Sequence, residues 1–542
     1  MSSVSAFEVV LLSLVAMVAL QLLARQLRLP PAVALLAGGI GMAFVPGLPP
    51  IDLDPDLVLV VILPPLLMYG GYFTVWDDLK RNMGGVMMLA IGAVTFTTLA
   101  VGWAAHWLVP GLPWAVCFAL GAIVSPPDAV AAKAILERLA LPRRLMVLLE
   151  GESLLNDAAG LTLFRFALAA ALTGGFSLRE ASLKFGELAI GGVVVGIVCG
   201  WLLLRAWRYI KDDYLVMVTS ILVSWGSYIA GEKLGVSGVI AAVSCGLVIG
   251  QNQHGVFSAA ARLRATSFWQ SLVFVFEALV FILIGLSLHG VMLRVAQGTD
   301  HDAWFQLALV SGSIVLVVIG SRFVWIFAVE AMKAVVDLFR VHVLRRPPAT
   351  LHASFGAADW RAATVMSWAG MRGVVTIAIA LSLPEGLPGR DLILVCSFAV
   401  ILATVVVQGV TIGVLIRWLL PPRTHQRESR YMSEPQAWAH IHEAQFAAID
   451  PLVHDKEGEL IHPRLFEQYQ YRANLAKRHS DQEDFPREAL ETHYDIVLAA
   501  IAAGRQTLLT LHRDGRIHDE LMHALEHDLD LQEISARHQR NG

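Results

Sequence analysis

The chain has 542 residues, of which 56% are hydrophobic and 16% charged, and its mean hydropathy is +0.61. Apolar residues make up only about half of an ordinary soluble domain, so this composition excludes that class. The formal net charge is −4, and no basic stretch interleaved with aromatic residues occurs, which argues against nucleic-acid binding. Apolar runs of about 20 residues recur until about residue 420, which predicts an all-α polytopic membrane protein.

The apolar runs predict about thirteen transmembrane helices. We expect them at about 6–24, 30–46, 55–73, 83–108, 112–135, 144–172, 184–208, 213–230, 236–252, 268–291, 304–333, 361–382 and 391–419. The first run is not expected to be a cleaved signal, because Met1 to Ser5 carries no Lys or Arg.

Positive charges concentrate in the loops after odd-numbered spans, as with Arg25 and Arg28 after the first span and Arg345 and Arg346 after the eleventh. Because positively charged loops stay in the cytoplasm, we expect a multi-pass protein of the cell (inner) membrane with its N-terminus outside. Residues 1–420 would then form the transmembrane domain, and residues 421–542 a cytoplasmic tail.

An odd number of spans allows spans 1–6 and 8–13 to be inverted repeats joined by span 7. The fifth member of each half is expected to break within the membrane. In span 5, Pro126 and Pro127 remove two backbone donors and free the carbonyls of Ala122 and Ile123. In span 12, Gly370-Met371-Arg372-Gly373 places a charge between flexible residues. The alternative is that both sites are ordinary kinks.

Span 6 contains Gly151-Glu152-Ser153-Leu154-Leu155-Asn156-Asp157 inside an apolar run. On a helix, Glu152 and Asn156 lie about 40° apart on one stripe, and Ser153 and Asp157 form a second stripe. An ionised carboxylate in lipid costs several kcal/mol unless it has a partner or a task. The two carboxylates therefore need not serve the same partner.

Arg322 in span 11 is the best candidate partner for Glu152, because it also lies in an apolar run. We interpret the two as a buried structural ion pair, and a transport role for Glu152 is the alternative. Asp157 is expected to be functional. Asp128 could cap the half-helix after the prolines, belong to the site, or do both. Arg372 could offset helix dipoles at the break in span 12.

The span 6 motif resembles the signature of the monovalent cation/proton antiporters, in the branch of bacterial NhaP proteins and animal sodium/proton exchangers. The similarity extends over about residues 5–420 and includes Leu63-Pro64-Pro65-Leu66-Leu67 in span 3, Ser125 to Ala132 and Gly370 to Gly373. It implies an NhaA-like antiporter fold with broken helices 5 and 12, a homodimer, and a core that moves like an elevator.

The resemblance also implies roles for individual residues. Asp157 would bind the cation or a proton, Asp128 would be the acidic residue of the broken helix, and Ser153 and Asn156 would assist. Glu152 and Arg322 match the family's structural ion pair. An Asn before Asp157 marks the electroneutral branch, in which one cation exchanges for one proton.

Two features depart from the family pattern. Relatives often have Asp followed by Pro in span 5, whereas Pro126 and Pro127 precede Asp128 here. Several relatives carry an acidic residue in span 3 where this chain has Tyr69. The backbone ligands and any role of that acid are therefore not carried over.

We expect a Na⁺ (or Li⁺)/H⁺ antiporter that serves pH homeostasis and in which cation and proton compete for Asp157, with Asp128 as a second oxygen ligand. A K⁺/H⁺ antiporter is the alternative within the same chemistry, and a passive cation channel is the alternative from another class. An enzyme is not expected, because the spans contain no Ser–His pair or metal-binding His motif, and no cofactor is expected.

The tail has a different composition, with 12 of the 18 histidines from His425 onward. Helical patterns at Arg487 to Leu511 and Asp519 to Leu529, with breaks at Pro451, Gly504 and Gly515, predict a small helical regulatory domain. Histidine would suit a pH sensor, and a solvated helical face without sensing is the alternative.

Overall fold

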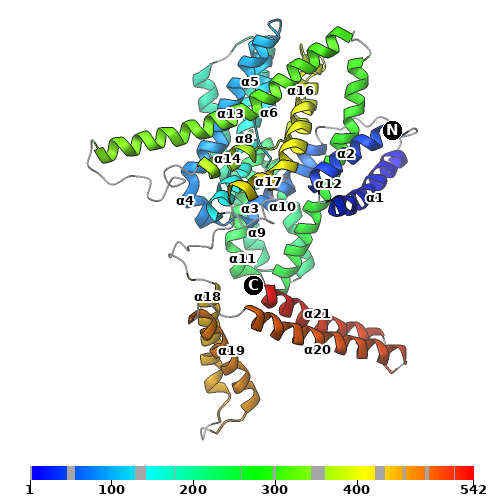
Figure 1. The fold of residues 1–542 in the computed structure, drawn as a ribbon, viewed down its shortest axis with the longest axis vertical. Helices are drawn as coiled ribbons and strands as arrows, with labels where there is room; N and C mark the ends of the chain where they lie inside the picture. The colour runs from blue at the N-terminus through cyan, green and yellow to red at the C-terminus, as the bar shows by residue number, and fades with distance from the viewer. Residues whose placement is uncertain are drawn as a thin grey trace. The chain divides into compact units, whose positions relative to one another are not determined.

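The computed structural model describes residues 3–27, 29–45, 55, 57–128, 142–175, 177–210, 212–257, 259–296, 301–342, 360–420, 432, 434–455, 459–481, 487–514, 516–517 and 519–541. The chain divides into two compact units, Met1–Arg423 and Thr424–Gly542. The first unit is built from helices throughout the part that is described (Figure 1).

The helices of the first unit fall on the predicted segments. In the first half they are α1 (Ser3–Leu27), α2 (Pro31–Ala43), η1 (Leu57–Ile62), α3 (Leu63–Phe73), α4 (Trp76–Met87), η2 (Met88–Ala93), α5 (Val94–Leu108), α6 (Trp114–Val124) and α8 (Arg143–Thr173). The second half of predicted span 5, residues 129–135, lies outside the described residues.

The remaining helices continue the same order. They are α9 (Leu178–Trp207), α10 (Asp213–Lys233), α11 (Gly238–Val256), α12 (Ala259–Ala296), α13 (His301–His342), α14 (Trp360–Trp368), α15 (Val374–Leu381), α16 (Arg390–Ala403), η3 (Thr404–Gln408) and α17 (Gly409–Leu419). Each predicted span thus contains described helix. The number of membrane crossings and the inverted repeat stay predictions.

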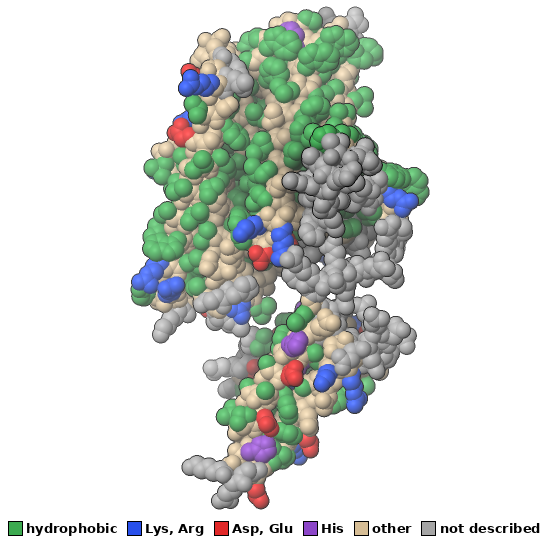
Figure 2. Space-filling view, turned by 90° about the vertical axis from the view of Figure 1, so that its left-hand side faces the viewer, with side chains coloured by type: hydrophobic (Ala, Val, Ile, Leu, Met, Phe, Trp, Pro, Cys, Tyr) green, Lys and Arg blue, Asp and Glu red, His purple; other side chains and the backbone are tan. Residues whose placement is uncertain are grey.

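The surface of this unit suits a lipid environment. Among the described residues, seven helices are long and apolar enough to cross a membrane, and shorter apolar helices include Pro31–Ala43 and Trp114–Val124. Figure 2 shows one face of the unit covered mainly by hydrophobic side chains, with few charged ones among them. Large apolar side chains such as Ile190 and Trp201 are 69% and 60% exposed. The chain is therefore a multi-pass membrane protein.

Two groups of helices meet beside α8. Helices α4, α5, α6 and α8 pack on one another, and we call them the site bundle. Helices α3, α9, α10 and α11 form a second group, the flanking bundle, in which glycines permit close backbone approach. A Cβ at Gly71 would lie 2.5 Å from the Val243 carbonyl oxygen, so only glycine fits there. The bundles contact each other less extensively, where α8 faces α3 and α11.

Proline shapes α3 and the π-helical turn η1 before it. Pro65 has no N–H, so the carbonyl of Val61, four residues earlier, lacks its helical partner. The indole Nε1 of Trp225 on α10 donates to that carbonyl at 2.8 Å. An unpaired carbonyl in an apolar medium is energetically costly, so the hydrogen bond from the Trp225 indole stabilises the backbone at Val61.

The second unit contains two antiparallel helix pairs. Helix α18 (Glu434–Ile449) packs on α19 (Pro463–Asp481), and α20 (Arg487–Arg513) packs on α21 (Asp519–Asn541). Pro451 lies in a 3-10 turn that ends α18, as predicted. The predicted break at Gly504 is wrong, because Gly504 continues α20 and faces Leu529 of α21. A small residue at this helix contact offsets the low helix propensity of glycine. Gly515 lies outside the described residues.

Candidate cation and proton site

Two non-helical segments of the first unit touch each other, and we call them the first interruption (residues 125–128) and the second interruption (residues 369–373). α6 ends at Val124, and residues 125–128 are not helical. α14 ends at Trp368 and α15 begins at Val374. The backbone N–H of Asp128 donates to the carbonyl of Met371 at 2.7 Å. Each non-helical segment thus satisfies a backbone group of the other, which is the condition for irregular backbone within a membrane.

Arg372 lies in the second interruption and is 1% exposed. Its Nε donates to the Val124 carbonyl at 2.6 Å, and its Nη1 donates to the Gly370 carbonyl at 2.7 Å. The Val124 carbonyl lies at the C-terminal end of α6, and the Gly370 carbonyl lies two residues after the C-terminal end of α14, where the helix dipole is negative. The backbone N–H of Arg372 donates to Thr404 Oγ1 at 3.1 Å. The guanidinium therefore holds both broken helices together.

Pro126 of the first interruption leaves the carbonyl of Ala122 without its helical donor, and a side chain of the same segment donates to it. The Ser125 hydroxyl donates to the Ala122 carbonyl at 3.1 Å and lies 3.1 Å from Thr98 Oγ1 of α5. Pro126 packs against Gly160 of α8, where a Cβ would overlap its ring. The carbonyl of Ala122, freed by the prolines, is thus already engaged by one donor.

Asp128 lies against Gly373, the residue that precedes α15. A Cβ at Gly373 would overlap the Asp128 carboxylate. The carboxylate is thereby placed at the N-terminus of α15, where the helix dipole is positive and favours an anion. The half-helix after the prolines, which Asp128 was predicted to cap, lies outside the described residues. The contact with α15 was not predicted.

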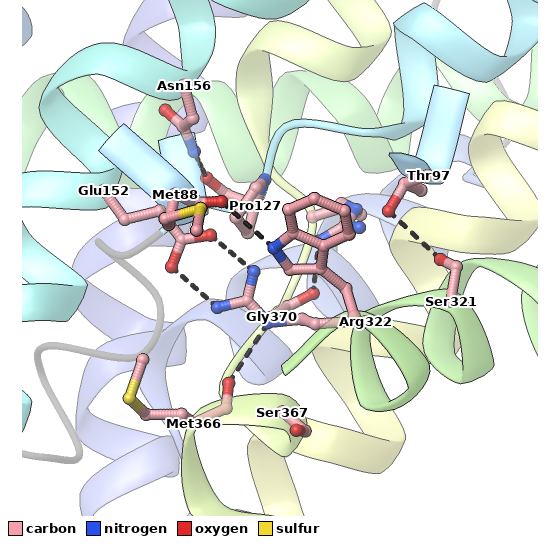
Figure 3. Close-up of polar contacts among 12 residues, drawn as sticks. Met88, Thr97, Pro127, Glu152, Asn156, Ser321, Arg322, Met366, Ser367 and Gly370 are labelled. Atoms are coloured by element: carbon pink, nitrogen blue, oxygen red, sulfur yellow. Dashed lines mark hydrogen bonds and ion pairs between the residues drawn. The ribbon is translucent and has the colours of Figure 1, made fainter. Parts of the chain in front are cut away.

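Glu152 on α8 pairs with Arg322 on α13 (Figure 3). Arg322 Nη1 and Nη2 lie 2.5 Å and 2.7 Å from the two carboxylate oxygens, and the side chains are 4% and 2% exposed. Arg322 Nε also donates to the Met366 carbonyl on α14 at 3.1 Å. The bidentate ion pair joins α13 to α8, and the hydrogen bond to Met366 joins α13 to α14.

Asn156 is one turn beyond Glu152 on the same stripe of α8 and is fully buried. Its Nδ2 donates to the Pro127 carbonyl, which ties α8 to the first interruption (Figure 3). Within the described part of the chain, its Oδ1 has no hydrogen-bond partner. An amide oxygen here is available to a further donor or to a cation.

Asp157 and Ser153 lie on the neighbouring stripe, and both are half-buried. Asp157 follows Asn156 on α8, and Asn156 Nδ2 donates to the carbonyl of Pro127, the residue before Asp128. The structure thus brings Asp128, Asn156 and Asp157 together at the interruptions. Glu152 and Arg322 form a separate pair. Two carboxylates, an amide oxygen and a hydroxyl are the hard oxygen ligands that alkali cations and protons share.

Sequence reasoning missed several supporting residues. Thr404 comes from η3 and Trp325 on α13 donates to the Met88 carbonyl of η2 at 3.0 Å. The Thr97 and Ser321 hydroxyls lie 3.1 Å apart between α5 and α13 (Figure 3). Pro65 indicates from sequence that the Val61 carbonyl needs a donor from elsewhere. The contacts of Thr404, Trp325, Thr97 and Ser321 have no such signal in the sequence.

Comparison with known proteins identifies the family of the chain. The transmembrane sodium/hydrogen exchanger family matches residues 10–418. The uncharacterized Na⁺/H⁺ exchanger YjcE of Escherichia coli is 31% identical over 509 residues, covering 89% of this chain and 90% of the relative. The Na⁺/H⁺ antiporter NhaP of Pseudomonas aeruginosa is 31% identical over 422 residues, covering 72% of this chain and 92% of the relative.

A solved structure shares the fold. The sodium proton antiporter MjNhaP1 from Methanocaldococcus jannaschii aligns with a TM-score of 0.60 at 20% identity, covering 78% of this chain and all of the antiporter. With the family match over most of the chain, this confirms the resemblance stated from the span 6 motif. The chain belongs to the sodium/hydrogen exchanger family.

Proposed function

We propose that the protein is a secondary-active antiporter that exchanges Na⁺ for H⁺ across the cell (inner) membrane. The observation that carries the proposal is the hydrogen bond from Asn156, beside Asp157, to the Pro127 carbonyl, beside Asp128, at two interruptions that touch each other. Broken helices supply dipole ends and irregular backbone at the depth where transporters bind ions. Acidic side chains at that depth are expensive without a task.

Competition for one carboxylate accounts for exchange. Asp157 binds either a cation or a proton, because occupancy by one removes the negative charge that attracts the other. Asp128, Ser153 and the Asn156 amide oxygen complete the set of oxygen ligands for a partly dehydrated Na⁺. The N-terminus of α15 offsets part of the negative charge on Asp128.

Coupling is one cation for one proton in this proposal. Asn156 stands beside Asp157 and cannot ionise, so the pair carries at most one negative charge. The site then moves in either loaded state with the same net charge. We further infer an orientation with the N-terminus outside and the tail inside, a homodimer in the lipid bilayer, and a contribution to pH homeostasis.

A K⁺/H⁺ antiporter is the second candidate. The sodium, potassium, lithium and rubidium/H⁺ antiporter of Bacillus pumilus is 32% identical over 399 residues, which cover 71% of this chain and 57% of the relative. Oxygen ligands alone do not select ion size. Comparing exchange with Na⁺, Li⁺ and K⁺ in proteoliposomes separates the two candidates.

The decisive experiment compares two matched Asp→Asn variants in proteoliposomes. D157N should abolish cation-dependent proton movement, while D391N should exchange as the unaltered protein does. Asp391 is exposed in the first turn of α16, and it is not one of the residues proposed to bind the ion. Normal exchange by D157N in a well-folded preparation would remove the proposal, and conductive flux without protons would favour a channel.

A further inference from the structure

An ion pair joins the site bundle to the flanking bundle at the end of α8 that is predicted to face outside. Arg165 Nη2 on α8 lies 2.9 Å from Glu232 Oε2 on α10, and the side chains are 43% and 32% exposed. The other oxygen of Glu232 accepts the backbone N–H of Gly238 at 3.2 Å, at the start of α11. Glu232 is therefore fixed within the flanking bundle.

Arg165 belongs to the other bundle. It lies eight residues beyond Asp157 on α8, or about 12 Å along the helix axis. α8 packs on α4 and α6, whereas α10 packs on α9 and α11, and α8 and α10 have little other contact. The ion pair is thus a direct polar link between the helix that carries the proposed site and the helices beside it.

The face of α8 that bears Arg165 is the face that meets the flanking bundle. Leu154, Leu161 and Arg165 follow one another at seven and four residues, so they share one side of the helix. Leu154 lies close to Gly70 of α3, where a Cβ would come within 2.9 Å of its side chain. Leu161, one turn before Arg165, is 9% exposed. Leu161 is therefore buried on this side of α8, between Leu154 and Arg165, and separation of the two bundles along this side would expose it.

We propose that Arg165 and Glu232 form a latch that holds the outer ends of the two bundles together and breaks when the outside of the site opens. The inference rests on the proposed function, because alternating access requires the site bundle to move relative to its neighbours. At an N–O distance of 2.9 Å the pair is in direct contact, and separation of the bundles beyond the reach of the two side chains breaks it. Half-exposed pairs of this kind shift an equilibrium by roughly two- to fivefold.

The test measures opening directly and needs no ion transport. L161C is introduced after the four native cysteines are replaced by alanine, and an impermeant maleimide is added outside right-side-out vesicles. R165Q and E232Q should each raise the labelling rate of L161C roughly two- to fivefold, and R165E/E232R should restore the original rate. R264Q is the matched control, because Arg264 pairs with Asp213 between α12 and α10 at 3.3 Å and touches neither α8 nor the site.

Unchanged labelling in R165Q and E232Q, with melting temperatures equal to that of the parent, would overturn the latch. An equal rise in R264Q would also overturn it, because general loosening would then explain the effect. A negative result for the latch would not contradict the proposed function, because that function is tested separately by ion exchange in the D157N variant. Conversely, faster labelling of L161C would persist even if the transported ion were not Na⁺.

Discussion

Replacing Glu152 by leucine would leave the Arg322 guanidinium buried without its carboxylate. The pair has two charge-assisted hydrogen bonds of 2.5 Å and 2.7 Å and side chains that are 4% and 2% exposed. Removing one partner of such a pair costs about 3–5 kcal/mol, because the remaining charge is uncompensated. The Met366 carbonyl, which accepts one Arg322 N–H at 3.1 Å, offsets only part of that penalty.

Removing both charges should be far less damaging. In E152L/R322M, apolar side chains of similar length replace the pair, and such exchanges are often neutral or stabilising. Thermal unfolding in detergent, followed by tryptophan fluorescence, should rank the unaltered protein and E152L/R322M together, with E152L clearly lower. K184Q is the control, since Lys184 and Glu187 form an exposed pair on α9 at 2.8 Å and contribute at most a few tenths of a kcal/mol.

Two results would refute this reasoning. If E152L melts with the unaltered protein, the pair has no structural importance. If E152L/R322M is stable but does not exchange ions, Glu152 takes part in transport and the structural interpretation is wrong. Exchange by the stable double variant would support it.

Three further predictions follow from the site and the tail. G373A should reduce exchange more than tenfold in proteoliposomes, because its methyl group would overlap the Asp128 carboxylate. N156D should make exchange respond to an imposed membrane potential, because it places a second ionisable group beside the first. R505Q should lower the melting temperature of the full chain equally at about pH 6 and about pH 9, since hydrogen bonds to two carboxylates raise the pKa of Arg505 and its contribution is lost only above that range.

Each of these has a control or a contrary outcome. G386A changes a glycine around which a Cβ would meet nothing within 4 Å, so its exchange should be normal. Full activity of G373A would contradict the tight fit at Asp128. Voltage-independent exchange by N156D would show that charge at this position does not determine coupling. A loss of stability in R505Q at only one of the two pH values would mean that another group titrates with it.

Charges and prolines in an apolar sequence predicted two features around the candidate site. Glu152 and Arg322 are 170 residues apart, yet each lies in an apolar run and each needs a compensating charge, so their pairing could be proposed from sequence. Pro126 and Pro127 remove donors that a helix requires, and the helix does end there. In both cases a single energetic penalty was large enough to decide the structure.

Other contacts depend on which helices lie side by side, and sequence spacing contains no such information. Arg372 donates to Val124, which is 248 residues away, and a carbonyl has no sequence signature. The close fit of Asp128 on Gly373 likewise arises only when the two interruptions are brought together. Gly504 shows the opposite error, since a local propensity was overridden by packing between α20 and α21.

The link between the two interruptions has a consequence for how such proteins diverge. The hydrogen bond from Asp128 to Met371 uses only main-chain atoms, so among replacements at position 128 only proline removes its donor. Relatives can therefore differ in the side chains around this hydrogen bond while the backbone contact between the two interruptions is kept. A shared architecture with the archaeal antiporter at 20% identity is what such a main-chain joint permits.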